Sequence, residues 1–230
     1  FGLIPLIAKN EIGYKKIIEL SSKSYLENET LEGPHCNFID LLEKPEGIII
    51  FSGNINGLIG KLFNKGRFSE IEEIYSNLKK NYKDNFYIEI QRHGDQNEKS
   101  FELNNLKLSK KLEIPIIATN EVYYLDKSMH NAHDALMCIG TKTYLNDKNR
   151  IKLTNQHYLK TSEEMETLFS DLPEALENNY NLPFRCCFKP ETSKPILPNI
   201  SSDKEGNADQ TLTKESLNGL KDKFLNFFKF

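Results

Sequence analysis

The chain lacks several residue patterns that define common protein classes. Tryptophan is absent, and the four cysteines, at positions 36, 138, 186 and 187 of 230, form no CxxC pair. This spacing excludes a disulfide framework and a structural zinc site, and reduced thiols indicate a cytoplasmic protein. No apolar run approaches the ~20 residues of a membrane helix. The P-loop, GxSxG and HExxH motifs are also missing, which excludes the enzymes that depend on them.

Charge and composition narrow the class further. Thirty basic and 33 acidic residues give a net charge of −3 and a pI near 6.0, which excludes nucleic-acid binding by bulk positive charge. Hydrophobic residues make up 38% of the chain, enough for a packed core. The length favours one domain with an appendage. Because the chain opens on an apolar run and ends on Phe-Leu-Asn-Phe-Phe-Lys-Phe, we expect it to be a piece of a longer polypeptide.

Short apolar runs alternate with helical periodicity over the first 140 residues, which predicts a parallel α/β sheet or barrel. The segment 28–37 is predicted as a loop. After residue 141 the pattern changes: Ser162 is the expected N-cap of one helix and Pro173 the first turn of another, followed by an extended arm with Pro190, Pro195 and Pro198. We predict strands at 3–8, 47–51, 86–90 and 115–118, and helices at 12–25, 38–43, 55–63, 68–81, 100–112, 128–139 and 212–230.

Polar residues follow three of the predicted strands. Asn54 lies after the second, His93 after the third and Glu121 after the fourth. Ligands collect beyond the carboxyl ends of parallel strands, so we expect these residues to lie close together. His93 and Glu121 are candidate ligands of a divalent metal that would activate water for phosphoester hydrolysis. The alternatives are a His93 that only hydrogen-bonds a loop and a Glu121 that is an ordinary capping or surface carboxylate.

The remaining histidines carry weaker signals. His130 and His133 have the i, i+3 spacing of a ligand pair beside Asp134, but without a third ligand they are interpreted as a polar helix face. His35 and His157 lie in polar segments and are interpreted as solvent-exposed groups. Residue types and their spacing alone therefore indicate an α/β domain with a vestigial metal site.

Several segments resemble the alpha subunit of bacterial DNA polymerase III, a C-family replicative polymerase. Ile116-Ile-Ala-Thr-Asn-Glu-Val-Tyr-Tyr124, with residues 132–140, resembles the end of its PHP (polymerase and histidinol phosphatase) domain. Further resemblances lie at 10–21, 50–57, 87–94, 162–178, 195–198 and 217–221. The resemblance covers nearly the whole chain and implies an α/β fold: a partial, distorted (β/α)7 PHP barrel that lacks its first strands and its His-x-His motif, followed by a mostly helical linker.

The resemblance also implies which metal ligands of the family this chain keeps and which it replaces. Metal-binding members have Cys after the Ser-Gly turn and close with Asn-Asp-x-His, and this chain has Asn54, Glu121 and Tyr123 at those positions. His93 alone keeps the ligand type, and a phenol of pKa ~10 replaces imidazole poorly. We therefore expect a vestigial metal set of His93 and Glu121, no cofactor in this part of the chain, no PHP metals, and Mg²⁺ only in the full-length polymerase.

The resemblance implies three regions: 1–141 as PHP domain, 142–188 as a helical extension and 189–230 as an arm and helix leading to the polymerase core. The whole protein would be a DNA-directed DNA polymerase in chromosomal replication, and this piece an inactive scaffold. Expected partners are the polymerase core of the same chain, a proofreading exonuclease subunit, the sliding clamp, and DNA through regions outside this chain, with no membrane contact. The alternatives are a free-standing PHP-type metal-dependent phosphoesterase and an interaction module.

Overall fold

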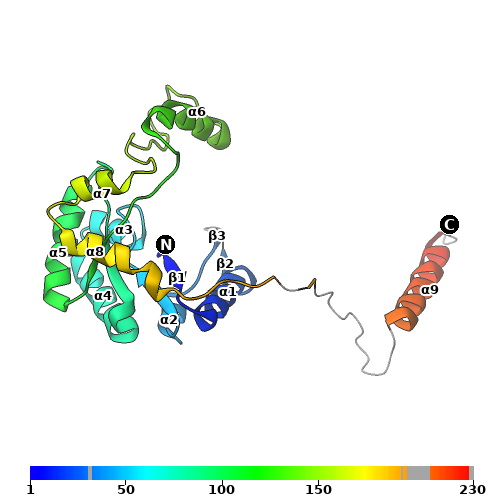
Figure 1. Cartoon of the computed structure of the whole chain (residues 1–230). Coiled ribbons are helices and arrows are strands. Elements are labelled where there is room, and N and C mark those ends of the chain that lie inside the picture. Colours follow the sequence, from blue (N-terminus) through cyan, green and yellow to red (C-terminus); the bar gives the residue numbers. More distant parts are fainter. Residues whose placement is uncertain (31–32, 193, 196–207, 228–230) are drawn as a thin grey trace. The chain divides into compact units, whose positions relative to one another are not determined.

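The computed structural model describes residues 1–30, 33–192, 194–195 and 208–227 (Figure 1). The chain divides into two compact units, Phe1–Lys189 and Pro190–Phe230. The first unit is a mixed α/β fold built on an open sheet, and it contains all the residues that the sequence marks as candidate ligands.

The sheet has the strand order β1-β4-β5-β6, with β1 at Leu6–Ala8, β4 at Ile48–Phe51, β5 at Phe86–Ile90 and β6 at Ile116–Ala118. Strands β4, β5 and β6 are parallel, as predicted. The expectation of an all-parallel sheet is wrong at β1, which pairs antiparallel with β4. Strand β1 is only half-buried, and antiparallel edge strands tolerate one solvated side, whereas parallel strands are normally covered on both.

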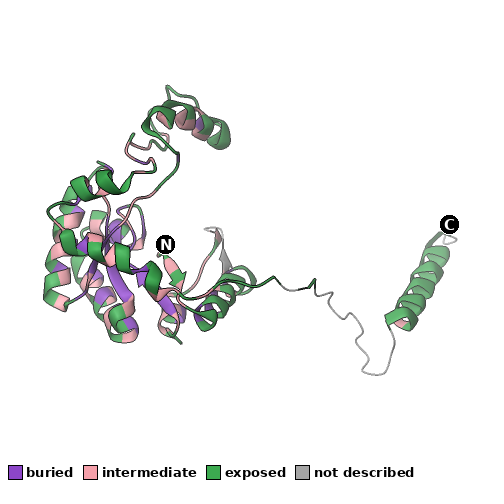
Figure 2. Ribbon diagram, viewed as in Figure 1, coloured by how far each residue is buried: buried purple, intermediate pink, exposed green. Residues whose placement is uncertain are grey.

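The core lies on both faces of the three parallel strands, whose residues form a continuous buried band in Figure 2. Side chains alternate between faces along a strand. One face holds the larger cluster, in which Ile48, Ile50, Phe86, Ile88 and Ile90 pack against helices. The other face holds a smaller cluster formed by Ile49, Phe51, Tyr87, Ile117 and Leu182.

Helices α3 (Leu58–Asn64), α4 (Phe68–Tyr82) and α5 (Glu98–Leu112) contribute to the larger cluster, close to their predicted positions. In α4 the buried residues Ile71, Tyr75, Leu78 and Tyr82 recur at helical spacing and form one stripe. The buried hydroxyl of Tyr75 donates to Oδ1 of Asn105 on α5 at 3.0 Å. This bond joins the two helices inside the core.

Helices α1 (Glu11–Leu26) and α8 (Pro173–Asn181) pack on strands of the sheet, α2 (Phe38–Leu42) packs on α4, and α7 (Ser162–Leu168) packs on α8. Helix α6 (His130–Thr141) projects away from the sheet (Figure 1). Helix α8 lies along the edge strand β6, and Asn178 Nδ2 donates to the carbonyl oxygen of Ile116 at 2.8 Å. The Asn178 side chain thus occupies a backbone acceptor of the edge strand, which makes that edge less available for pairing with another chain.

Three local expectations are corrected. The predicted loop 28–37 contains a short antiparallel pair, β2 (Glu29–Thr30) and β3 (Gly33–Pro34). The N-cap of α7 is Thr161, one residue before the expected Ser162, because the Thr161 side chain accepts from the backbone N–H of Glu164 in a capping box. Helix α6 starts two residues later than expected, after a 3₁₀ turn at Lys127–Met129.

The described part of the second unit contains α9 (Ala208–Phe227), which begins four residues before the predicted helix. Residues 228–230 of that prediction, and Pro198 of the predicted arm, lie outside the described residues. Pro190 and Pro195 lie in neither helix nor strand. Among the described helices, none combines the length and the apolar character that crossing a membrane requires.

Candidate functional site at the carboxyl ends of the parallel strands

The segments that follow β4, β5 and β6 meet at one end of the sheet. Asn54, from the first, donates its side-chain N–H to Glu121 Oε2, from the third, at 3.0 Å. The backbone N–H of Glu121 donates to Nε2 of His93, from the second, at 3.1 Å. The structure thus brings Asn54, His93 and Glu121 together, as parallel strands require.

Glu121 is occupied by hydrogen bonds. Its other carboxylate oxygen, Oε1, accepts from the hydroxyl of Tyr123 at 3.1 Å. Burial and the charge of Glu121 raise the pKa of the Tyr123 phenol, so this group stays a neutral donor at neutral pH. Asn54, Tyr123 and Glu121 therefore satisfy one another.

His93 is buried, with 1% of its surface exposed. Its loop is anchored by Glu98, at the start of α5, whose carboxylate accepts from the backbone N–H groups of His93 (2.9 Å) and Gly94 (2.7 Å). Gly94 has a φ of +76°, a left-handed conformation that glycine adopts without steric cost and that turns the chain sharply after the strand. The loop geometry fixes the backbone that carries His93 and Asp95.

Residues 150–159, here called the return segment, bring a further histidine to this end of the sheet. Tyr123 N donates to the carbonyl of His157 at 2.9 Å, and Leu159 N donates to the carbonyl of Tyr124 at 3.0 Å. The Thr154 hydroxyl donates to the carbonyl of His93 at 2.6 Å. These bonds place His157 against His93, and the expectation that His157 is solvent-exposed is wrong: its exposed fraction is 0%.

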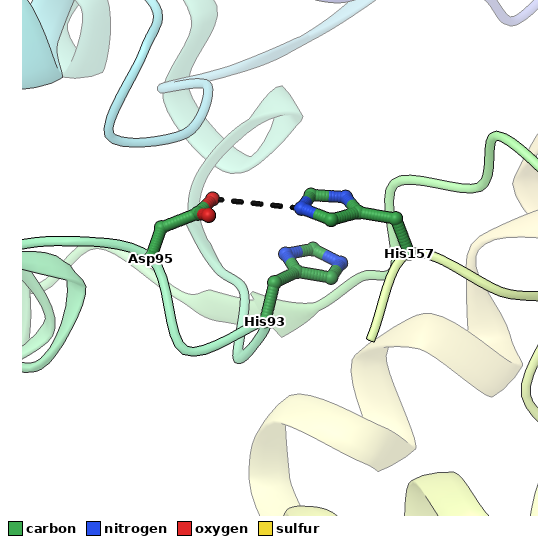
Figure 3. Close-up of side chains that lie close together, drawn as sticks. All are labelled: His93, Asp95 and His157. Atoms are coloured by element: carbon green, nitrogen blue, oxygen red, sulfur yellow. Dashed lines mark ion pairs between the residues drawn. The ribbon is translucent and has the colours of Figure 1, made fainter. Parts of the chain in front are cut away.

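His93, Asp95 and His157 form a group whose ligand atoms all lie within 4.8 Å of one another (Figure 3). The two imidazole rings stack with centroids 4.1 Å apart, and His157 Nε2 lies 3.7 Å from Asp95 Oδ2. The neighbouring His157 imidazole holds the pKa of the Asp95 carboxyl below its usual range. Sequence reasoning missed Asp95 and His157. The His-Gly-Asp spacing of 93–95 was a usable signal, whereas nothing local marks His157.

The other histidine pair serves a structural purpose. Asp134 forms an ion pair with Arg150, and His130 Nε2 lies 3.0 Å from the carbonyl oxygen of Leu153. Both contacts hold the return segment on α6. Within the described residues His130, His133 and Asp134 are not part of a group that could hold a metal ion, and Cys138 on the same helix is buried.

The strand ends open into a polar cavity of about 910 Å³. Glu89 lines it from β5, and burial raises the pKa of its carboxyl. Asp95 lines the cavity, whereas His93 and His157 are buried and do not line it. The cavity is also lined by Asn54, Gln91, Thr119, Asn120, Glu121 and Tyr123.

An α/β fold with polar residues gathered at its strand ends is the arrangement of the PHP domain, and the PHP domain model matches residues 3–93. The chain is 39% identical over 220 residues to the DNA polymerase III subunit alpha of Rickettsia bellii, an alignment that covers 96% of this chain and 19% of that relative. It is 34% identical to the Caulobacter vibrioides subunit, in an alignment that covers 94% of this chain and 19% of the relative. It is 38% identical to the subunit of Borreliella burgdorferi, with 96% of this chain and 19% of the relative covered. The chain is similar to DNA polymerase III alpha subunits along nearly all of its own length and spans about a fifth of theirs.

PHP domains imply bound metal, and the residues at the family positions do not fit it. Tyr123 is a neutral phenol that donates to the Glu121 carboxylate, and His93 and Glu121 alone fall short of the three protein ligands that a catalytic zinc site usually has. Asn54 presents its N–H, which is a donor and not a ligand, toward that carboxylate. Two of the family positions of this chain, Asn54 and Tyr123, therefore present hydrogen-bond donors where metal-binding members have ligands.

Proposed function

We propose that this chain is a non-catalytic scaffold within a replicative DNA polymerase alpha subunit. The observation that carries the proposal is that Asn54 and Tyr123 donate hydrogen bonds to Glu121 at positions where a metal-dependent phosphoesterase would have metal ligands. Similarity to alpha subunits along 96% of the chain supplies the context. His93 and Glu121 are then a vestigial ligand pair.

The proposal includes the finer features that the resemblance implies. The open sheet would be part of a distorted (β/α)7 barrel, divided into regions 1–141, 142–188 and 189–230. The scaffold would pack on the polymerase core of the same protein, which extends primers with Mg²⁺, and would contact the proofreading exonuclease subunit and the clamp assembly in the cytoplasm. DNA would be bound by regions outside this chain.

The alternative of a free-standing PHP phosphoesterase is less well supported. The alignment with the alpha subunits continues well beyond residue 141, through the helices α7 and α8. Arg92, next to the strand-end site, is paired with Asp171 between those helices, so the extension is integral to the domain. A phosphoesterase site alone gives no reason for this extension.

Two assays test the proposal. The purified chain, supplied with Mg²⁺, Mn²⁺ or Zn²⁺, should neither extend a primed template nor hydrolyse a generic phosphodiester, with a metal-dependent phosphodiesterase as positive control. Exchanging the matched region of the Rickettsia bellii subunit for this chain should preserve primer extension by that subunit. Hydrolysis by the chain that disappears in Glu121→Gln would overturn the proposal, as would a chimaera that folds but cannot extend a primer.

A further inference from the structure

One arginine of the chain differs from the other three in what it binds. The three that form ion pairs with acidic side chains are Arg67, Arg92 and Arg150. In the described part of the chain the guanidinium of Arg185 donates only to neutral oxygens, namely the carbonyl of Asp84 at 3.0 Å and the hydroxyl of Tyr87. It also donates to Oδ1 of Asn85 at 2.6 Å. Hydrogen bonds therefore hold this guanidinium in place, while no carboxylate among these partners neutralises its charge.

A second cation contacts the same amide oxygen. Lys9 Nζ donates to Asn85 Oδ1 at 3.1 Å, so an ammonium and a guanidinium share one neutral acceptor. Within the described residues Lys9 forms no ion pair either, and the neighbouring carboxylate of Asp84 is 93% exposed and pairs with Lys79 at 3.8 Å. Like charges held side by side repel each other, and an anion bound between them would remove that repulsion.

The fold brings these groups together at the amino ends of the parallel strands. Lys9 directly follows β1, and β1 runs antiparallel to β4, so Lys9 lies where β4 and β5 begin. Asn85 directly precedes β5, and Arg185 ends the 3₁₀ turn Pro183–Arg185 that follows α8. The cluster therefore lies at the end of the sheet opposite the strand-end site, and it joins three segments that are far apart in the sequence.

Backbone hydrogen bonds fix the position of the cluster. The N–H of Cys187 donates to the carbonyl of Lys9 at 3.1 Å, and the N–H of Lys9 donates to the carbonyl of Gly47 at 2.7 Å. The N–H of Arg185 donates to the carbonyl of Leu182 at 3.0 Å. Because the backbone is held on both sides, the two cations are already oriented before any ligand binds.

Donor groups of the cluster remain available to a ligand. A lysine ammonium has three N–H groups and a guanidinium has five, and the bonds of Lys9 and Arg185 within the described residues use only some of them. The hydroxyl of Tyr87 accepts from Arg185, and its own proton has no acceptor among the described residues. Both cations are only half-buried, so an ion from solvent can reach them and their charges are screened only in part.

We propose that Lys9, Arg185 and the Tyr87 hydroxyl bind one phosphate group, either as inorganic phosphate or as a phosphate monoester. The N–H groups of a guanidinium match the oxygens of an oxyanion, and a lysine adds a compact positive charge. A phosphate group of this class carries a charge of about −1.5 to −2 at pH 7, enough for both cations, whereas a carboxylate would neutralise only one. Asn85 is a positioning residue, because its oxygen holds both cations.

The site has a structural consequence that is independent of the proposed scaffold function. A bound phosphate would tie the turn after α8 to β1 and to the start of β5, since each of these segments contributes one of the binding groups. Anything that binds the folded chain and not the unfolded chain raises its stability. The chain should therefore unfold at a higher temperature when phosphate is present.

Titration of the full 230-residue chain with inorganic phosphate tests the proposal. In a low-salt buffer without phosphate, calorimetry should show one saturable site per chain, and the unfolding temperature should rise with the phosphate concentration. Sulfate, also a dianion, should compete, and acetate should bind at least about 10-fold more weakly. Raising NaCl to roughly 0.15 M should weaken phosphate binding, because salt screens the two cations.

Substitutions then locate the site. Lys9→Met and Arg185→Gln should each weaken phosphate binding by about 10-fold or more, because each removes one positive charge. Asn85→Asp places a carboxylate on the oxygen that both cations share, so it should abolish phosphate binding and at the same time raise the unfolding temperature. The matched controls Lys107→Met and Arg67→Gln, elsewhere on the surface, should bind phosphate as the unmodified chain does.

Arg185→Gln also removes three hydrogen bonds to neutral oxygens, so circular dichroism checks that this variant is folded. Lys9→Met and Asn85→Asp change half-buried side chains and keep the Arg185 guanidinium, so their results stand even if Arg185→Gln unfolds. Asn85→Asp also separates a ligand site from a purely structural cluster, because only a ligand site has phosphate binding to lose as stability rises.

An oligonucleotide with a 5′-phosphate, and the same oligonucleotide without it, distinguish the two sources of the phosphate group. Binding of the phosphorylated form alone supports a monoester, and binding of inorganic phosphate without either oligonucleotide supports the free ion. Three results would overturn the proposal: no saturable phosphate binding, binding that Lys9→Met and Asn85→Asp leave unchanged, or equal binding of the two oligonucleotides. None of these results bears on primer extension, so the scaffold function is tested separately.

Discussion

Glu89 carries an ionisable carboxyl group in the interior of the sheet. Its carboxyl is almost fully buried on β5; Gln91 Nε2 donates to Oε1 at 2.9 Å, and the Thr119 hydroxyl donates to the same atom. Oε2 has no hydrogen-bond partner within the described ranges. Burial raises the pKa of this carboxyl because the charged form loses its hydration.

The raised pKa gives stability a pH dependence of known sign. Between the ordinary and the raised pKa the folded state binds more protons than the unfolded state, so the free energy of unfolding falls as pH rises through that interval. Glu89→Gln, which keeps an acceptor for Thr119 and Gln91, should stabilise the chain on the order of 1 kcal/mol at pH 8 and have little effect at pH 4. Urea unfolding at both pH values measures the difference.

An exposed carboxyl provides the control for this experiment. Glu46→Gln should leave the unfolding curves superimposed at both pH values, because Glu46 lies at the surface. Loss of stability at pH 8 in Glu89→Gln would mean that the ionised carboxylate is stabilising and that its burial is not the dominant effect.

At the scale of elements, Arg92 joins the end of β5 to three helices. Its guanidinium donates to Glu102 on α5, to the carbonyl of Leu168 at the end of α7 (2.6 Å), and to both oxygens of Asp171 before α8 (2.7 and 2.8 Å). Bidentate charged hydrogen bonds are among the stronger polar contacts. The side chain is 20% exposed, so solvent screens it only partly.

Arg92→Ala should therefore destabilise the chain by about 2–4 kcal/mol, since it leaves Glu102 and Asp171 without their partner. Arg67→Ala removes an exposed pair with Glu70 and should cost no more than about 1 kcal/mol. Denaturant unfolding of both variants tests the comparison. Equal losses would show that the Arg92 network adds nothing beyond an ordinary surface pair.

Two helical glycines should respond to alanine in opposite ways. A Cβ on Gly13 in α1 would lie 1.8 Å from the carbonyl oxygen of Gly47, a backbone atom that cannot move aside, whereas a Cβ on Gly140 in α6 would meet open space. Gly13→Ala should cost about 3 kcal/mol or more and loosen α1 from the sheet. Gly140→Ala should be neutral or stabilise by up to about 1 kcal/mol, because alanine is the better helix former.

Thermal unfolding followed by circular dichroism distinguishes the two variants. A folded Gly13→Ala protein with an unchanged midpoint would mean that α1 does not approach β4 as closely as the structure has it. A destabilised Gly140→Ala would point to a neighbour for α6 that this chain does not contain.

At the scale of the whole molecule, the sequence pattern predicted the parallel strands and the helices between them, because buried apolar runs and helical periodicity are local signals. It failed for the direction of β1, since a short apolar run carries no information on the orientation of its neighbour. It grouped Asn54, His93 and Glu121 because parallel strands end together. It could not find His157, which reaches the site only through the backbone pairing of the return segment with residues 123–124.

The buried core residues of the described chain all lie in the first unit, and α9 has none. A chain ending at residue 189 should therefore unfold at the same temperature as the full chain, within about 2 °C. Differential scanning calorimetry of the two proteins makes the measurement. A drop of about 5 °C or more would show that residues 190–230 stabilise the sheet.

The position of the return segment in the sequence has a consequence during synthesis. Strands β1, β4, β5 and β6 have all been synthesised by residue 118, about forty residues before His157. At translation rates of about 5–20 residues per second, the sheet has roughly 2–8 seconds to form while His93 has no covering partner. The strand end is therefore completed only after the return segment has been synthesised and has packed its His157 ring on His93.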